Sequence, residues 1–287
     1  MSQPITEFVY KLPGTSSSSR PGAHRSRSRG SGMSFAAHAR LFDQPDPRRL
    51  DLRASLTDIR GDWLVRTHLQ RSSVPIKAIV DVSASMHFGA PGKLQVATNF
   101  LGALGHSANA YGDSVSLLAF DASFREDLYL PPRSGRGAGI ALASAISSCI
   151  GSEAKAGSSS ALTHTIDQIS GTSGLVFLVS DFHWSLHEIE PVLDKLSSAM
   201  VVPIVIWDEA EVIPPPPGQL LPVRDVETGT VKRLWLRNAL RKRWLDNVQQ
   251  RQIAIQELFA QHDVDPFFIR GDFNAENLSR YFMEKVA

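Results

Sequence analysis

The chain has 287 residues, of which 43% are hydrophobic and 21% are charged, and its 30 Lys and Arg residues against 29 Asp and Glu residues give a formal net charge of +1. This apolar content suffices for a substantial core, and the balanced charge excludes a protein that binds polyanions through its overall charge, so nucleic acid is not an expected partner. The lone Cys149 excludes an intramolecular disulfide framework, and without an apolar run near about 18 residues or a secretion-signal pattern we expect a cytoplasmic protein with no membrane span.

Two segments precede the main domain. Residues 1–29 are rich in Ser, Arg, Gly and Pro and are predicted to be disordered, because such a composition has little apolar surface to bury. Residues 30–73 form an arginine-rich lead-in that also carries apolar residues, such as Phe35 and Trp63, and we expect it to pack on the core. We interpret its arginines as solvated and ion-paired; the alternative is a docking surface for an acidic partner or nucleic acid.

Residues 74–210 alternate strand and helix patterns. Short β-branched runs between turn residues predict buried strands, and apolar residues spaced three or four apart predict amphipathic helices. This alternation predicts an α/β domain with a mostly parallel central sheet covered on both faces. The predicted strands cover 76–82, 114–120, 124–130, 174–181 and 201–207, and the predicted helices cover 93–111, 140–150, 161–169 and 186–197.

Residues 211–287 form a C-terminal extension that we expect to complete the fold. It begins with the four prolines of 214–217, a stiff connector. The following patterns predict a hairpin over 221–236, a long helix over 236–261, a strand over 266–269 and a last helix over 276–286.

Two of the predicted strands end in acid, which points to a site at one edge of the sheet. Asp81 ends one strand and is followed by Ser83 and Ser85, and Asp181 ends another. In sheets of this class, ligand sites form where loops leave the carboxyl ends of the strands. A buried carboxylate is costly without a partner, and carboxylate and hydroxyl oxygens suit Mg²⁺ or Mn²⁺. The sequence therefore indicates a candidate metal site.

The Asp81-x-Ser83-x-Ser85 loop after an apolar strand resembles the metal-ion-dependent adhesion site of von Willebrand factor A domains. The resemblance implies a Rossmann-like three-layer fold in which Asp181 is the third part of the site. It also implies that a middle loop supplies a hydroxyl: the register set by Leu162 indicates Ser160, with Ser158 and Ser159 as alternatives. Such a domain is a non-catalytic module whose cation is completed by an acidic residue of the partner.

A wider resemblance covers about residues 22–280. The stretches 30–35, 46–55, 112–120, 178–182 and 221–229 are similar to a bacterial family known as domain of unknown function 58. Members are encoded beside MoxR-type AAA+ ATPases. The resemblance implies such an ATPase as partner, and a chaperone-like role in assembling or activating other complexes.

Other readings of the sequence remain open. One is a metal-free scaffold with a vestigial site. Another is a metal-dependent phosphohydrolase, but nucleophilic enzymes of that layout need a second Asp two residues after the first, where this chain has Ser83, so we expect no enzyme. His183 and His187 are four residues apart; we interpret them as surface residues because no third ligand is evident.

Overall fold

The computed structural model describes residues 7–12, 21–30, 34–151, 155–168, 173–224 and 231–285. Within them a six-stranded sheet has the order β11-β8-β7-β4-β5-β6, in which β6 alone runs antiparallel to its neighbour. The predicted α/β fold with a mostly parallel sheet is thereby confirmed. The strands are β4 (Pro75–Asp81), β5 (Ser114–Phe120), β6 (Leu130–Arg133), β7 (Gly174–Ser180), β8 (Ala199–Trp207) and β11 (Phe267–Arg270).

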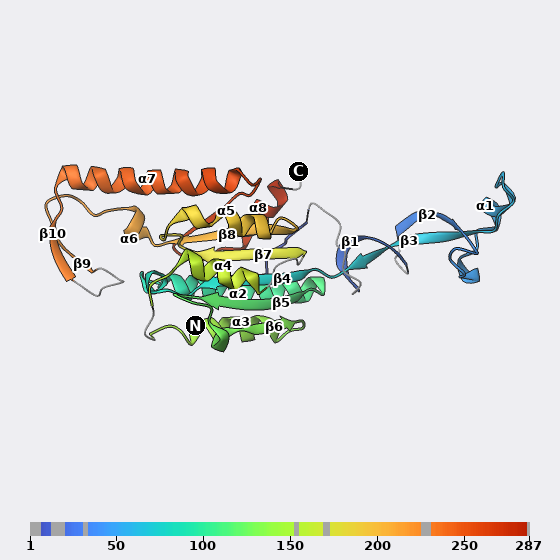
Figure 1. Cartoon of the computed structure of the whole chain (residues 1–287), viewed down its shortest axis with the longest axis horizontal. Coiled ribbons are helices and arrows are strands. Elements are labelled where there is room, and N and C mark those ends of the chain that lie inside the picture. Colours follow the sequence, from blue (N-terminus) through green and yellow to red (C-terminus); the bar gives the residue numbers. More distant parts are fainter. Residues whose placement is uncertain are drawn as a thin grey trace.

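Helices cover both faces of this sheet and make three layers (Figure 1). Successive strand residues point to opposite faces, so Ala78 and Val80 join one core and Ile79 the other. The first core takes α2 (Lys93–Tyr111), α3 (Ala138–Ser147) and α8 (Ala275–Glu284). The second takes α4 (Ser159–Asp167), α5 (Glu190–Lys195) and α7 (Asn238–Ala260).

The C-terminal extension supplies parts of the sheet and of both cores. After β8 and the short α6 (Glu209–Val212), a hairpin of β9 (Leu220–Arg224) and β10 (Val231–Trp235) leads into α7. Strand β11 then pairs in parallel with β8 at the edge of the sheet. None of the helices in the described residues has both the length and the apolar character that crossing a membrane requires.

The strand predicted over 124–130 is wrong. A 3₁₀ turn, η3 (Glu126–Leu128), fills its centre, and the strand that pairs with β5 is β6. Arg125 explains the turn, because its guanidinium bonds Asp121 and Asp127 on either side of it.

The expectation that residues 1–29 are disordered is wrong for their described part. Phe8 and Tyr10 are fully buried in the core that contains α2 and α8, and β1 (Pro21–Gly30) forms a strand. The Phe8 ring stacks on Phe282, and the Tyr10 hydroxyl donates to the buried Asp113. Segments 1–6 and 13–20 lie outside the described residues.

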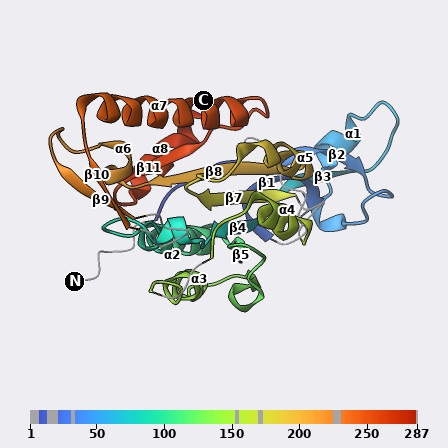
Figure 2. The ribbon, with the colours of Figure 1, turned by 60° about the vertical axis from the view of Figure 1, so that its left-hand side comes forward.

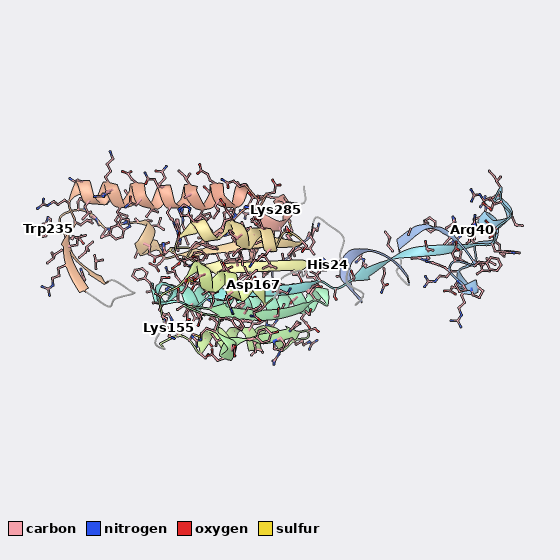
Figure 3. All side chains as sticks on the ribbon, in the orientation of Figure 1. His24, Arg40, Lys155, Asp167, Trp235 and Lys285 are labelled. Carbon is pink, nitrogen blue, oxygen red and sulfur yellow. The ribbon has the colours of Figure 1, made fainter. Side chains whose placement is uncertain are left out.

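The lead-in does not pack on the core as predicted but projects from it as an arm (Figure 1, Figure 2). Its three-stranded antiparallel sheet has the order β1-β3-β2, with β2 (Ser34–Arg40) and β3 (Leu64–Ser72) joined through η1 (Pro47–Arg49) and α1 (Leu52–Leu56). Figure 3 labels His24 at the root of the arm and Arg40 far from the core. Ion pairs within the arm join Arg66 to Asp51 and Arg40 to Asp62.

Candidate functional site

The two acids predicted from the strand ends meet at the carboxyl edge of the sheet. Asp81 is the last residue of β4, and Asp181 follows β7, which pairs with β4 in parallel. Both side chains are fully buried. The arm joins the amino end of β4, so it leaves the domain at the edge opposite the two acids.

Asp81 is held by three hydrogen-bond donors. Its Oδ1 accepts from the backbone N–H of Ser83 at 2.9 Å, and its Oδ2 accepts from Ser180 Oγ at 2.7 Å and Trp184 Nε1 at 3.0 Å. Burial and the charge of Asp181 nevertheless raise the pKa of Asp81, and they outweigh these hydrogen bonds. The carboxylate is thus fixed in position, and no cationic side chain among the described residues pairs with it.

Ser83 and Ser85 lie in the tight turn that follows Asp81. Their hydroxyl oxygens are 3.2 Å apart, and the 3₁₀ turn η2 (Ala84–His87) carries Ser85. The backbone N–H of Ala84 donates to the Lys155 carbonyl at 2.8 Å, which ties this turn to the middle loop. In Figure 3 Lys155 lies at the end of the domain away from Arg40.

Lys93 is a central residue of the site that the sequence analysis did not identify. Its side chain is 1% exposed, and its Nζ lies 2.7 Å from Asp181 Oδ2 and 2.6 Å from Glu211 Oε1. One signal in the sequence is its position at the first residue of α2, because a cation at a helix N-terminus is unfavourable unless acids surround it. Lys93 therefore supplies an internal counter-charge to Asp181.

The environment of Asp181 favours its ionised form. Burial acts to raise the pKa of Asp181, but the charges of Lys93 and His183, with hydrogen bonds from Lys93 and Ser85, hold it below its usual range. The same pattern applies to Glu211. Burial acts to raise its pKa, but His183 and Lys93 lower it below its usual range. Lys93 thus pairs with both Asp181 and Glu211 and is not the counter-charge of Asp81.

The middle loop lies against the serine turn at Gly157. A Cβ on Gly157 would lie 2.9 Å from both Cβ and Oγ of Ser83. The hydroxyl of Ser160 is exposed and lies 2.6 Å from that of Ser158. Ser160 also lines a separate cavity with Phe124, whereas Ser159 is buried. Ser158 and Ser160 both remain candidates for the middle-loop hydroxyl.

The donors around Asp81 fit a hard divalent cation. No group of three His, Cys, Asp or Glu residues that could hold a metal exists in the part of the chain that the structure describes, which includes His183 and His187. The set of Asp81, Ser83 and Ser85 is of another kind, with one carboxylate and two hydroxyls, and Mg²⁺ and Mn²⁺ accept such oxygens. Because no described residue supplies a counter-charge to Asp81, a cation there would offset the cost of its burial.

We predict that Gly157→Val disables the site without unfolding the domain. The new side chain has no space beside Ser83, which is fully buried, so the middle loop must move away from the serine turn. Gly137→Val is the matched control, because a Cβ there meets nothing within 4 Å. Thermal unfolding with and without millimolar Mn²⁺ measures the effect. We expect Mn²⁺ to stabilise the Gly137→Val control, and we expect Gly157→Val to bind the cation at least about tenfold more weakly. Equal responses would contradict this placement of the loop.

Comparison with known proteins identifies a family match. The family model described as protein of unknown function DUF58 matches residues 46–254. Comparison with curated proteins finds no match.

Solved structures with similar folds share little sequence with this chain. A conserved hypothetical protein, BatB, from Bacteroides thetaiotaomicron is 16% identical, with a TM-score of 0.44 over 75% of this chain and 98% of that chain. Manganese-loaded TRAP protein from Plasmodium vivax is 14% identical, with a TM-score of 0.39 over 75% of this chain and 74% of that chain. A von Willebrand factor type A protein from Catenulispora acidiphila is 13% identical, with a TM-score of 0.37 over 77% and 43%.

Proposed function

This chain belongs to the DUF58 family, and we propose that it is a non-catalytic protein-interaction module that binds an acidic partner surface through a divalent cation. In this proposal Asp81, Ser83 and Ser85 hold Mg²⁺ or Mn²⁺, and Ser158 or Ser160 adds a middle-loop hydroxyl. Asp181 acts on the cation indirectly in this proposal, through bound water, since its Oδ2 already pairs with Lys93. One observation carries the proposal: Asp81 is a fully buried carboxylate beside two adjacent hydroxyls. Donors on Ser83, Ser180 and Trp184 fix it, and no cationic side chain among the described residues pairs with it.

The chemistry of this donor set favours binding over catalysis. One carboxylate and neutral hydroxyls offset only part of the charge of a divalent cation, so the cation keeps affinity for an acidic group. A carboxylate on the partner would satisfy that remaining charge. The position two residues after Asp81, where a phosphohydrolase needs an acid, is Ser83, which supports the proposal that the protein is not an enzyme.

The partner that we propose is a MoxR-type AAA+ ATPase, with which the chain would act in the cytoplasm to assemble or activate other complexes. The support is the family resemblance and the lack of a nucleotide-binding loop in this sequence, which assigns any use of ATP to the partner.

Binding of the purified MoxR-type ATPase from the same genome tests this function. We expect binding in millimolar Mg²⁺, with at least about a tenfold loss in EDTA and in Ser83→Ala. Ser148→Ala is the control, because this exposed hydroxyl donates to the Ala145 carbonyl at the end of α3 and is not one of the proposed ligands. Binding that is insensitive to EDTA and to Ser83→Ala would instead support a metal-free scaffold. The internal pairing of Asp181 with Lys93 is the observation that favours that second candidate.

A further inference from the structure

A cavity of about 580 Å³ lies beside the candidate site, between α7 and the carboxyl ends of β7 and β8. This volume is in the range of small-ligand pockets, roughly 300–1,000 Å³. Its walls are largely apolar and include the indole rings of Trp207 and Trp244 and the side chains of Leu240 and Val248. The cavity can therefore take a bulky apolar group.

Specific contacts hold the walls of the cavity apart. The buried residues of α7 are Ile255, Leu258 and Phe259, all in its second half. The first half of the helix therefore contributes no fully buried side chain to the core. In Figure 1 this first half lies near α6 and the hairpin. Trp244 Nε1 donates to the Glu211 carbonyl at 2.8 Å, and Arg251 Nε donates to the Phe182 carbonyl at 3.1 Å. These hydrogen bonds fix the helix without filling the space beneath it.

The charges around the cavity favour an anion. Arg243 is exposed at its rim and makes no hydrogen bond or ion pair with any described residue. Arg251 and His183 line the cavity as well. The one acid in the wall, Glu211, already accepts from Lys93 at 2.6 Å and from the Asp208 backbone N–H at 3.1 Å. The remaining local charge is thus positive.

The cavity adjoins the candidate site, because two of its lining residues contact Asp181. His183 lines the cavity, and its backbone N–H donates to Asp181 Oδ1 at 3.1 Å. Trp207, in the wall, donates through Nε1 to the Asp181 carbonyl at 2.9 Å. A chain segment bound at the serine turn would therefore pass close to the cavity.

We propose that this cavity binds a peptide segment of the partner in which a bulky apolar side chain stands next to a carboxylate. The apolar side chain would lie between Trp207, Trp244 and Leu240, and the carboxylate would pair with Arg243. That the occupant is a protein rests on the proposed function; the preference for an apolar anion rests on the cavity itself.

A pair of probes with the same ring and opposite charge tests this preference. Indole-3-propionate and tryptamine are titrated into the full chain in EDTA, with binding followed by saturation-transfer NMR. A ligand of this size is expected to bind with a Kd on the order of 1 mM, and tryptamine at least about tenfold more weakly. Arg243→Glu is expected to weaken indole-3-propionate at least about tenfold. The adjacent Lys242→Glu, which lies outside the cavity lining, is expected to leave its Kd unchanged within about twofold.

Two results would overturn the inference: no binding of indole-3-propionate, or equal binding by the wild type and Arg243→Glu. Because EDTA removes any cation, neither result depends on the metal site. Ser83→Ala is expected to bind the probe like the wild type, so a failure of the metal-dependent function leaves the preference of the cavity for an apolar anion standing. Loss of probe binding with an intact Mn²⁺ response would remove this inference alone.

Discussion

Replacement of Lys93 by methionine is expected to lower the free energy of unfolding by about 3–5 kcal/mol, since it leaves the buried Asp181 without its counter-charge. The side chains of Lys93 and Asp181 are 1% and 0% exposed, and 2.7 Å separates Nζ from Oδ2. Methionine keeps the length and apolar stem but cannot donate to Asp181 or Glu211. Urea unfolding at pH 7 in EDTA measures the change.

A double variant shows that the loss comes from the unpaired charge and not from packing. In Lys93→Met with Asp181→Asn, an uncharged amide replaces the buried carboxylate, so we expect at least half of the lost free energy to return. Glu211 is 21% exposed, so water can solvate it in part without Lys93. If Lys93→Met unfolded within about 1 kcal/mol of the wild type, Lys93 would not be the counter-charge of the site.

Phe8→Ala is expected to cost a similar amount, about 3–5 kcal/mol, because it opens a cavity among buried aromatic rings. Phe8 is 1% exposed, and its ring lies 6.2 Å from that of Phe100 and 6.4 Å from those of Phe282 and Phe177. The side chain links α2, α8 and β7 from a segment of the chain that precedes them all.

The neighbouring Val9→Ala is the control for Phe8→Ala. Val9 is 38% exposed, so its truncation is expected to change the unfolding free energy by less than about 1 kcal/mol. Thermal or urea unfolding of both variants makes the comparison. A loss below about 1 kcal/mol for Phe8→Ala would mean that the N-terminal segment does not belong to the core.

Periodicity in the sequence was sufficient to predict most of the central fold. The apolar residues of 93–111 recur on one helical face, and the helix α2 has the same bounds, ending at Gly112, whose φ of 73° stops it. The four parallel strands predicted between 76 and 207 are all present, because each is an apolar run long enough to be buried on both faces.

Long-range contacts are the part that local patterns could not predict. Phe8 and Tyr10 stand before a stretch rich in Ser and Arg, and only the folded chain brings them to Phe282 and Asp113. The prediction that the lead-in packs on the core rested on apolar residues such as Phe35 and Trp63, yet these side chains are 53% and 50% exposed in the arm. Composition does not reveal which apolar residues of a chain become buried in its core.

The candidate site could be predicted only as far as its strand ends. Asp81 and Asp181 follow apolar strands, and the topology of a parallel sheet brings them to one edge. Lys93 and Glu211 come from α2 and α6, which lie 118 residues apart in the chain, so their ion pair has no local signature. The choice between Ser158 and Ser160 depends on loop geometry, which spacing does not determine.

Unfolding with and without a divalent cation tests the central claim most directly. The wild type, Asp81→Ala and the control Ser148→Ala are unfolded in EDTA and in a titration of Mg²⁺ or Mn²⁺. A cation that binds only the folded state stabilises it by about 2.7 kcal/mol at 100 times its Kd. We predict this gain in the wild type and the control and its loss in Asp81→Ala. No gain in the wild type, or an equal gain in Asp81→Ala, would contradict a cation site built on Asp81.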